Sequence, residues 1–254
     1  MTPEAYVQDK TAKSGSSFYY AFLFLPPPRR AAITAFYAFC REVDDVVDEA
    51  TDAGVAAAKL AWWRQEVASA YSGQPNHPVM RALMPHTQTF AIEAAHLLAV
   101  IEGCQMDVHP QRFENWEDLS GYVWKVACAV GLVSIRLFGC KDPGSERYAV
   151  ALGHALQLTN ILRDIAEDLS NGQRIYLPLA DLAKFGYTEQ DLVARVRDDR
   201  FLALMAYEAD RAEGFFREAA AALPAVDQTA LVPARIMGEI YHLLLEKMRT
   251  DHFR

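Results

Sequence analysis

The chain has 254 residues, of which 52% are apolar and 23% charged, and this composition excludes a disordered or low-complexity protein. Its formal net charge of −8 argues against general nucleic-acid binding, and 13 glycines with 12 prolines are too few for a turn-rich all-β fold. An anionic substrate would need a local attraction, because the overall field of the protein repels it.

The apolar residues repeat at the i, i+3, i+4, i+7 spacing of one helix face, beginning with a helix from Pro28 to about Glu49 that Pro26 and Pro27 precede. The same reasoning predicts further helices over Ala56–Tyr71, Pro78–Met106, Trp116–Phe138, Ser145–Leu169, Arg200–Leu223 and Pro233–Met248. No strand alternation, internal repeat or flexible linker interrupts them. We therefore predict one all-α domain over residues 1–254.

Localisation signals are weak in this sequence. Its four cysteines, at positions 40, 104, 128 and 140, form no CxxC motif or Cys/His cluster, so we expect free thiols and no zinc site. The N-terminus lacks the basic-then-apolar order of a signal peptide. The longest apolar run, Val126 to Ile135, is about half of the roughly 20 residues that span a bilayer. We expect a soluble cytoplasmic protein, with peripheral contact to the inner membrane left open.

The first acidic cluster, DDVVDE, begins at Asp44. At 100° per residue, Asp44 lies about 40° and Asp48 about 80° from Cys40, the centre of the apolar stripe, whereas Asp45 points outward. Two like charges four residues apart repel each other by a few tenths of a kcal/mol even when exposed, and by more when buried. Arg41 lies one turn upstream, but a single arginine cannot neutralise this set.

The second cluster, NILRDIAEDL, begins at Asn160. Asp164 and Asp168 repeat the same i, i+4 spacing, and Gln157 and Asn160 precede them on the same polar strip. That strip runs beside an apolar stripe, while Arg163 projects elsewhere around the helix.

Each cluster alone is compatible with a solvated helix face, but two with the same spacing beside apolar stripes favour a metal site. Carboxylates one turn apart converge, and Mg²⁺ takes oxygen ligands while keeping water and phosphate oxygens. If the two helices face each other, several Mg²⁺ ions between them would invert the local charge and hold diphosphate. An apolar remainder of the cavity would suit a hydrocarbon chain, so the pattern indicates prenyl diphosphate chemistry.

The sequence resembles the squalene/phytoene synthase family of head-to-head prenyl transferases in SGSSFYYAFLFLP (14–26), YAFCREVDDVVDE (37–49), QLTNILRDIAEDLSNGQRIYLP (157–178) and, more loosely, GYVWKVACAVG (121–131). Within the family, the first two passages and WWRQE (62–66) are most similar to bacterial presqualene diphosphate synthases of hopanoid biosynthesis. The resemblance implies an isoprenoid-synthase-like helical bundle with a central cavity. It also implies Mg²⁺-dependent condensation of two farnesyl diphosphates to presqualene diphosphate and diphosphate.

The resemblance assigns roles to single positions. The expected Mg²⁺ ligands are Asp44, Asp48, Asn160, Asp164 and Asp168. The positions expected to line the diphosphate, the reaction centre or the prenyl chain are Ser17, Phe18, Phe22, Tyr37, Arg41, Tyr122, Gln157, Asn160, Arg163 and Tyr176. Catalytic roles are expected for the four aspartates together with Arg41 and Tyr122.

Two features depart from the family pattern. Trp124 stands where a second tyrosine is usual, so a hydroxyl near the reaction centre is expected to be missing. Relatives of this type commonly continue beyond the position of Arg254 into a basic stretch, whose diphosphate contacts are then expected to be absent. The sequence also has no GxGxxG-type segment, and we expect no NADPH-dependent reduction.

Several alternatives remain open. Within the family they are a phytoene synthase, which joins two C20 chains, and a hydroxysqualene synthase acting on presqualene diphosphate. Outside it, Glu93-x-x-His96 and Glu239-x-x-His242 show the pattern of di-iron carboxylate bundles. A non-catalytic helical scaffold would leave the paired aspartates without an ion. The expected partner is a small prenyl diphosphate and not nucleic acid, and the oligomeric state is open.

Overall fold

The computed structural model describes residues 1–15, 17–109 and 111–253, with only the backbone of Ser17. Within this part of the chain the regular elements are helices and no strand is present, which confirms the predicted all-α fold. In chain order they are α1 (Pro3–Lys13), α2 (Ser17–Phe22), α3 (Pro27–Asp48), α4 (Ala53–Tyr71), α5 (Pro78–Thr87), α6 (Ala94–Met106), α7 (Trp116–Val123), η1 (Trp124–Cys128), α8 (Ala129–Phe138), α9 (Gly144–Ser170), α10 (Leu179–Lys184), α11 (Glu189–Val193), α12 (Asp199–Ala222), η2 (Ala225–Asp227) and α13 (Val232–Thr250).

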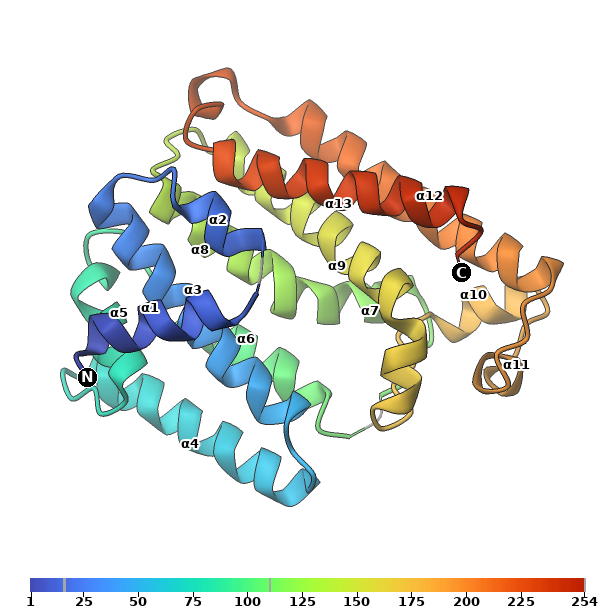
Figure 1. Cartoon of the computed structure of the whole chain (residues 1–254), viewed down its shortest axis with the longest axis horizontal. Helices are drawn as coiled ribbons and strands as arrows, with labels where there is room; N and C mark the ends of the chain where they lie inside the picture. The colour runs from blue at the N-terminus through green and yellow to red at the C-terminus, as the bar shows by residue number, and fades with distance from the viewer. Residues whose placement is uncertain (16, 110, 254) are drawn as a thin grey trace.

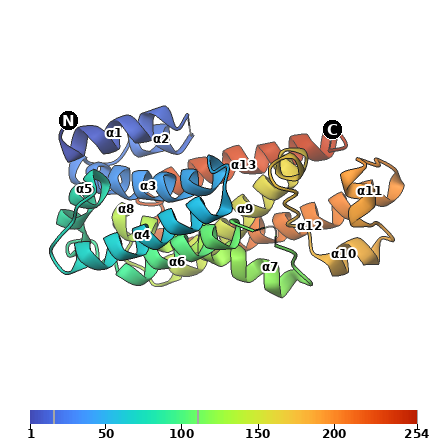
Figure 2. The ribbon, with the colours of Figure 1, turned by 90° about the horizontal axis from the view of Figure 1, so that it is seen from below.

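Two long helices, α3 and α9, organise the bundle (Figure 1). Helix α12 packs along α9, and α13 contacts α2, α9 and α12. Helices α1 and α2 lie on the outer side of α3 (Figure 2). Large side chains that are fully buried come from most of the long helices and include Phe36, Phe39, Leu60, Leu97, Ile101, Leu137, Leu158 and Leu204. Each contributes about 1.5–3 kcal/mol on burial, so the core fixes the positions of α3 and α9.

The single helix predicted over Pro78–Met106 is wrong, because the chain forms α5 and α6 with a turn between them. Ala91 has a φ of 51°, and the N–H of Ile92 donates to the carbonyl of Thr87 at 2.9 Å. The N–H of Ala91 donates to Gln88 at 3.4 Å, which completes a Schellman ending. An alanine here takes the left-handed conformation that usually marks a glycine, so the sequence pattern gives no warning of the break.

The helix predicted over Trp116–Phe138 is present as a continuous helical path, but Trp124–Cys128 forms a π-helical turn within it. Gly103 on α6 and Gly153 on α9 face this turn, and a Cβ on either would come within 2.5–3.0 Å of its atoms. The two glycines therefore let α6 and α9 pack closely against the wider turn.

By length and composition, Trp116–Phe138 is also the one helical stretch of the described residues that could cross a membrane, with a mean hydropathy of 1.4. In this fold it packs against α6 and α9. Its two basic residues bind neighbours, since Lys125 lies 3.4 Å from Glu102 and Arg136 donates to the carbonyl of Ala91 at 2.6 Å.

Helix α1, which apolar periodicity does not predict, changes the surroundings of α3. Lys10 Nζ lies 2.7 Å from Asp45 Oδ2, and the Tyr6 hydroxyl donates to Glu42 at 2.6 Å. The expectation that Asp45 points outward is therefore wrong, because its side chain is 18% exposed and pairs with both Lys10 and Arg41.

Candidate active site

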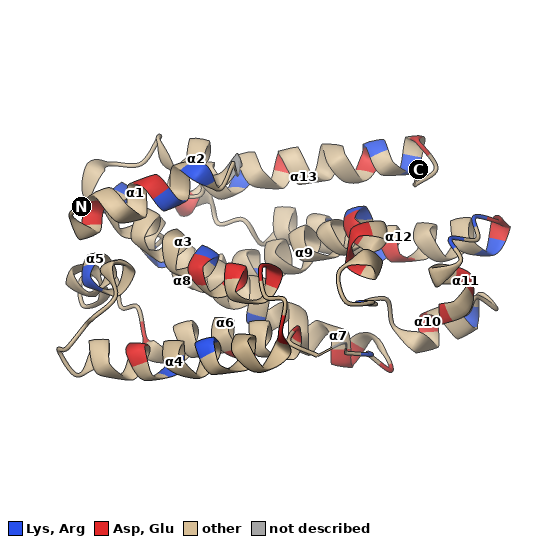
Figure 3. Ribbon diagram, turned by 60° about the horizontal axis from the view of Figure 1, so that its bottom comes forward, with Lys and Arg blue, Asp and Glu red and all other residues tan. Residues whose placement is uncertain are grey.

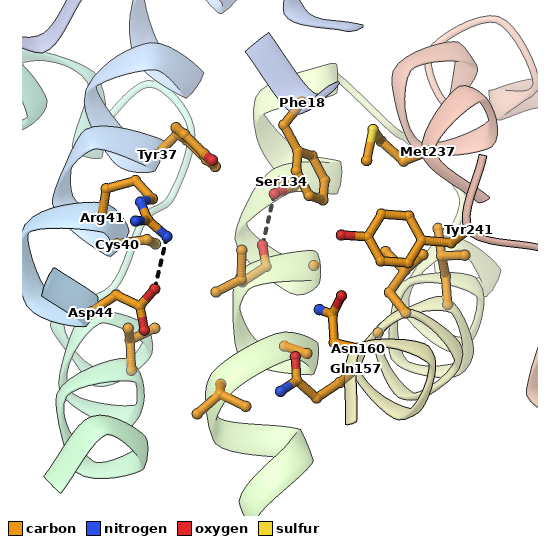
Figure 4. A pocket seen from close by; sticks show the side chains of 18 of the residues that line it. Phe18, Tyr37, Cys40, Arg41, Asp44, Ser134, Gln157, Asn160, Met237 and Tyr241 are labelled. Carbon is orange, nitrogen blue, oxygen red and sulfur yellow. Dashed lines mark hydrogen bonds and ion pairs between the residues drawn. The ribbon is translucent and has the colours of Figure 1, made fainter. Parts of the chain in front are cut away.

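A pocket of about 520 Å³ lies between α2, α3, α6, α8, α9 and α13 (Figure 4). All predicted site residues whose side chains are described line it: Phe18, Phe22, Tyr37, Arg41, Asp44, Asp48, Tyr122, Gln157, Asn160, Arg163, Asp164, Asp168 and Tyr176. The predicted role of Ser17 falls on a side chain outside the described residues. The two acidic strips thus face one cavity, which is the condition for a shared diphosphate site.

The pocket has an acidic end and an apolar end because α3 and α9 run in the same sense along it. Ile33 and Tyr148 line it near the starts of these helices, and the aspartates line it near their ends. At 1.5 Å per residue, Asp44 lies about 16 Å beyond Ile33 along α3. Acidic residues gather where the ends of α3 and α9 approach each other (Figure 3). Helix C-termini carry partial negative charge themselves, so this end attracts cations.

The first aspartate pair is held by two arginines. Arg41 donates from Nη1 to Asp44 at 2.9 Å and from Nη2 to Asp45 at 2.8 Å, and Arg174 donates to Asp48 at 3.3 Å. Burial and then the charge of Asp48 raise the pKa of Asp44 to about 6, although Arg41 acts in the opposite direction. The repulsion predicted from the i, i+4 spacing is therefore present in the folded protein.

The second pair shows the same physics. Arg163 donates from Nε and Nη2 to both oxygens of Asp164 at 2.6 Å. Burial and then the charge of Asp164 raise the pKa of Asp168 to about 7, with Arg174 lowering it. Arg163 lines the pocket, as the family resemblance implies. The expectation from helix geometry, that its side chain projects elsewhere around the helix, is wrong.

Sequence reasoning missed a fifth carboxylate, Asp107, which follows α6 and lines the pocket. The hydroxyls of Tyr122 and Tyr176 donate to its two oxygens at 2.8 and 2.7 Å, and the tyrosine rings stack with their centroids 5.3 Å apart. Burial raises the pKa of Asp107 and is the larger effect, whereas the hydrogen bonds from the two tyrosine hydroxyls lower this pKa. The charge of Asp107 also raises the pKa of Asp44 and of Asp168, which line the same pocket.

The donor set fits Mg²⁺ bound together with a phosphate ligand. In residues 1–15, 18–109 and 111–253, no three His, Cys, Asp or Glu side chains are placed to hold one metal ion. Mg²⁺ is usually held by one or two carboxylates plus water and substrate phosphate, which is what separated Asp pairs can supply. The Asn160 Oδ1 atom is buried without a hydrogen-bond partner among the described residues, so an oxygen ligand is available beside Asp164.

The rest of the pocket is aromatic and aliphatic. Phe18 and Phe22 contact the Tyr37 ring at centroid distances of 6.0 and 5.7 Å, and the Tyr241 hydroxyl points into the pocket from α13 (Figure 4). Trp124, the departure from the family pattern, is 41% exposed and is not part of the described pocket wall.

The di-iron alternative is wrong. Glu93 precedes the first turn of α6 and lies 3.7 Å from Arg136, while His242 on α13 pairs with Glu213 on α12 at 2.7 Å. These residues form no shared site within the described part of the chain.

Comparison with known proteins agrees with this geometry. The sequence profile of squalene/phytoene synthase matches residues 11–254. The 15-cis-phytoene synthase of Synechocystis sp. is 36% identical over 256 residues, covering 96% of this chain and 75% of the relative. The presqualene diphosphate synthase of Rhodopseudomonas palustris is 36% identical over 253 residues, covering 99% and 90%.

Solved structures share the whole fold. Squalene synthase HpnC from Alicyclobacillus acidocaldarius superimposes with a TM-score of 0.89 at 31% identity, covering 99% of this chain and 95% of that one. A dehydrosqualene synthase in complex with a ligand gives a TM-score of 0.85 at 31% identity, covering 99% and 87%. With the profile match, the paired aspartates and the apolar cavity, these likenesses show that the chain belongs to the squalene/phytoene synthase family.

Proposed function

We propose that this chain catalyses the Mg²⁺-dependent head-to-head condensation of two farnesyl diphosphates to presqualene diphosphate and diphosphate, in squalene and hopanoid biosynthesis in the cytoplasm. The observation that carries the proposal is one pocket with two Asp-x-x-x-Asp strips at one end and buried aromatic side chains at the other. Such a pocket matches a substrate with a diphosphate head and a hydrocarbon chain.

The acidic end would bind the diphosphate groups. The residues that would hold Mg²⁺ there are Asp44, Asp48, Asn160, Asp164 and Asp168. The bound ions would stabilise the negative charge that develops on the departing diphosphate. Arg41, Arg163 and Arg174 line the same end and can donate to diphosphate oxygens, since each guanidinium has more N–H groups than its aspartate partners use.

The proposed reaction breaks the C–O bond of one farnesyl diphosphate and leaves an allylic cation. The double bond nearest the diphosphate of the second molecule attacks this cation, and loss of a proton closes the cyclopropane ring. Phe18, Phe22 and Tyr37 would keep water from the cation. One candidate proton acceptor is the departing diphosphate. The other is Tyr122 or Tyr176, which would take the proton while passing its own hydroxyl proton to Asp107, to which both donate.

A phytoene synthase, condensing two C20 chains, is the second candidate, because relatives of both kinds are 36% identical to this chain. Chain length is governed by the apolar end, where the buried side chains of Phe22, Phe138 and Tyr148 meet the pocket. Three large aromatic residues at this end favour the shorter C15 substrate.

Incubation with farnesyl or geranylgeranyl diphosphate, with Mg²⁺ and without NADPH, tests the proposal. Mass spectrometry of the products should detect a C30 diphosphate from the C15 substrate, and EDTA should abolish it. A C40 product from the C20 substrate alone would replace the proposal by the phytoene synthase reading. Release of diphosphate without any coupled product would refute both.

A further inference from the structure

Three connections lie together at the end of the bundle that holds the apolar end of the pocket (Figure 1). They are residues 23–30, which comprise the α2–α3 connection and the first turn of α3, residues 139–143 between α8 and α9, and residues 223–231 between α12 and α13. Arg29 Nη1 donates to the carbonyl of Phe138 at 2.9 Å, which joins the first connection to the second. Asp227 accepts backbone N–H groups of residues 141 and 142 at 2.8–3.0 Å, which joins the third. The three connections, here called the loop surface, therefore form one continuous face.

The loop surface exposes large apolar side chains. Leu23 is 46% exposed, Phe24 73% and Val226 66%, and the three prolines at 26–28 are exposed beside them. Single exposed apolar residues are common on soluble proteins, but several on one face mark an interaction site. No acidic residue occurs in the segment 23–30.

The loop surface is also basic within an acidic protein. Arg29 and Arg30 follow the prolines, and exposed Lys141 lies on the second connection. The two acidic residues on the three connections are Asp142, which is half-buried and accepts the N–H of Gly144 at 2.7 Å, and Asp227, which is buried and accepts from backbone N–H groups and the Ser145 hydroxyl. The three basic residues of the loop surface exceed its two acidic residues by one, so this face is slightly positive on a chain whose net charge is −8. Its charge is complementary to anionic lipid headgroups.

Helix residues that flank these segments line the pocket at this end. Phe22 lines the pocket and directly precedes exposed Leu23, and Phe138 lines it directly before the connection that carries Lys141. The residues that close this end of the pocket are thus direct chain neighbours of residues on the loop surface.

We infer that the loop surface docks onto an anionic phospholipid bilayer, with Leu23, Phe24 and Val226 inserted into the interface and the basic residues at the headgroups. Docking itself follows from exposure and charge alone. Its purpose, delivery of a hydrocarbon product from the apolar end of the pocket to the membrane, rests on the proposed function. Insertion of a few large apolar side chains together with basic residues gives reversible peripheral binding.

Sedimentation of the full chain with vesicles of phosphatidylcholine, with or without phosphatidylglycerol, tests the inference. We expect binding to the vesicles that contain phosphatidylglycerol, weakened by added salt because screening reduces the headgroup attraction. The double variant Leu23→Glu/Phe24→Glu should bind these vesicles at least about tenfold more weakly. Lys141→Glu should weaken binding by about fivefold or more on these vesicles and leave binding to pure phosphatidylcholine unchanged.

The matched control is Val55→Glu/Val193→Glu, which adds the same charge at side chains that are 50% and 56% exposed. Val55 lies on α4, beyond the far end of α3, whose 22 residues span about 33 Å, and Val193 ends α11 at the opposite end of the molecule (Figure 1). This control should bind vesicles containing phosphatidylglycerol within about twofold of the parent chain.

Absence of binding by the parent chain, or equal binding by Leu23→Glu/Phe24→Glu, overturns the inference. Circular dichroism verifies the fold of each variant, and Phe24→Trp gives a second readout through a blue shift of its emission on vesicle addition, whose absence overturns the inference as well. Turnover of farnesyl diphosphate in detergent without vesicles is measured in parallel. Vesicle binding without turnover would leave docking intact and refute the proposed function, and turnover without vesicle binding would do the reverse.

Discussion

Replacing Asp168 by asparagine is expected to stabilise the metal-free protein while abolishing most of its activity. Asp168 lies one turn from Asp164 and in the field of Asp107, and burial with these charges raises its pKa to about 7 from the ordinary 3.8. Above that pH the ionised carboxylate opposes folding unless a cation is bound. Asparagine has nearly the same shape and removes the charge.

The size of the effect follows from the pKa. A pKa of about 7 in place of 3.8 corresponds to about 4 kcal/mol, at 1.36 kcal/mol for each pKa unit. Because the side chain is half-buried, solvent screening reduces this figure to about 2 kcal/mol. The folded pKa is raised, so the penalty is absent below the unfolded pKa and complete above the folded one. The gain in Asp168→Asn should therefore be largest near pH 8.5 and vanish towards pH 4.

Equilibrium urea unfolding in EDTA measures this gain, and diphosphate release measures turnover, which should fall at least about 100-fold. Addition of Mg²⁺ with inorganic diphosphate should stabilise the parent chain more than the variant. Glu167→Gln is the matched control, because it removes a charge from the adjacent, exposed position of α9 that does not line the pocket, and it should change stability by less than about 0.5 kcal/mol. If Asp168→Asn were less stable than the parent chain in EDTA, repulsion among the carboxylates would not be the dominant effect at the acidic end of the pocket.

Three further predictions concern other parts of the molecule. Asp107→Asn should lower turnover at least about tenfold with the fold unchanged by circular dichroism, because the amide has one acceptor oxygen in place of the two to which the tyrosine hydroxyls donate. Full turnover would contradict this prediction. Burial raises the pKa of Glu208 to about 8 from 4.5, so the free energy of unfolding should fall by up to about 5 kcal/mol between pH 4.5 and 8. The comparison is Glu208→Gln, in which Arg211 keeps its Asp181 partner. Parallel pH profiles of urea unfolding for the two chains would refute this prediction. Phe138→Ala should raise turnover of the C20 substrate relative to the C15 one about tenfold in a competition assay, and an unchanged ratio would show that chain length is set elsewhere.

Local periodicity explains why most of the fold could be predicted. The helices over Ala53–Tyr71 and Gly144–Ser170 agree with their predicted bounds within three residues, because their apolar stripes and end signals lie within single segments. The break at Ala91 could not be predicted in the same way, since a left-handed alanine forms the turn that a glycine would have announced. Helix α1 has a weak apolar face and is held by polar contacts to α3, so no periodic signal precedes it.

Within the candidate site, too, local sequence spacing reveals some residues and not others. Asp44 and Asp48, like their counterparts on α9, share a helix face at a spacing that the sequence displays directly. Asp107 has no such partner, because its two hydrogen bonds come from Tyr122 on α7 and from Tyr176 beyond the end of α9. Only the tertiary fold brings these three residues together, so a search of the sequence for paired carboxylates does not find Asp107.

The charge of the pocket wall gives a reason for more than one bound cation. Among the residues that the structure describes, five aspartates line the pocket, and the basic residues that line it are three arginines, each already paired with an aspartate. With all groups ionised the wall is negative by two charges, so the arginines alone cannot attract a diphosphate. One Mg²⁺ would only neutralise this wall, and a second would make it positive. The spacing that makes the carboxylates repel each other in the metal-free protein is thus the same feature that would let an acidic protein bind an anionic substrate.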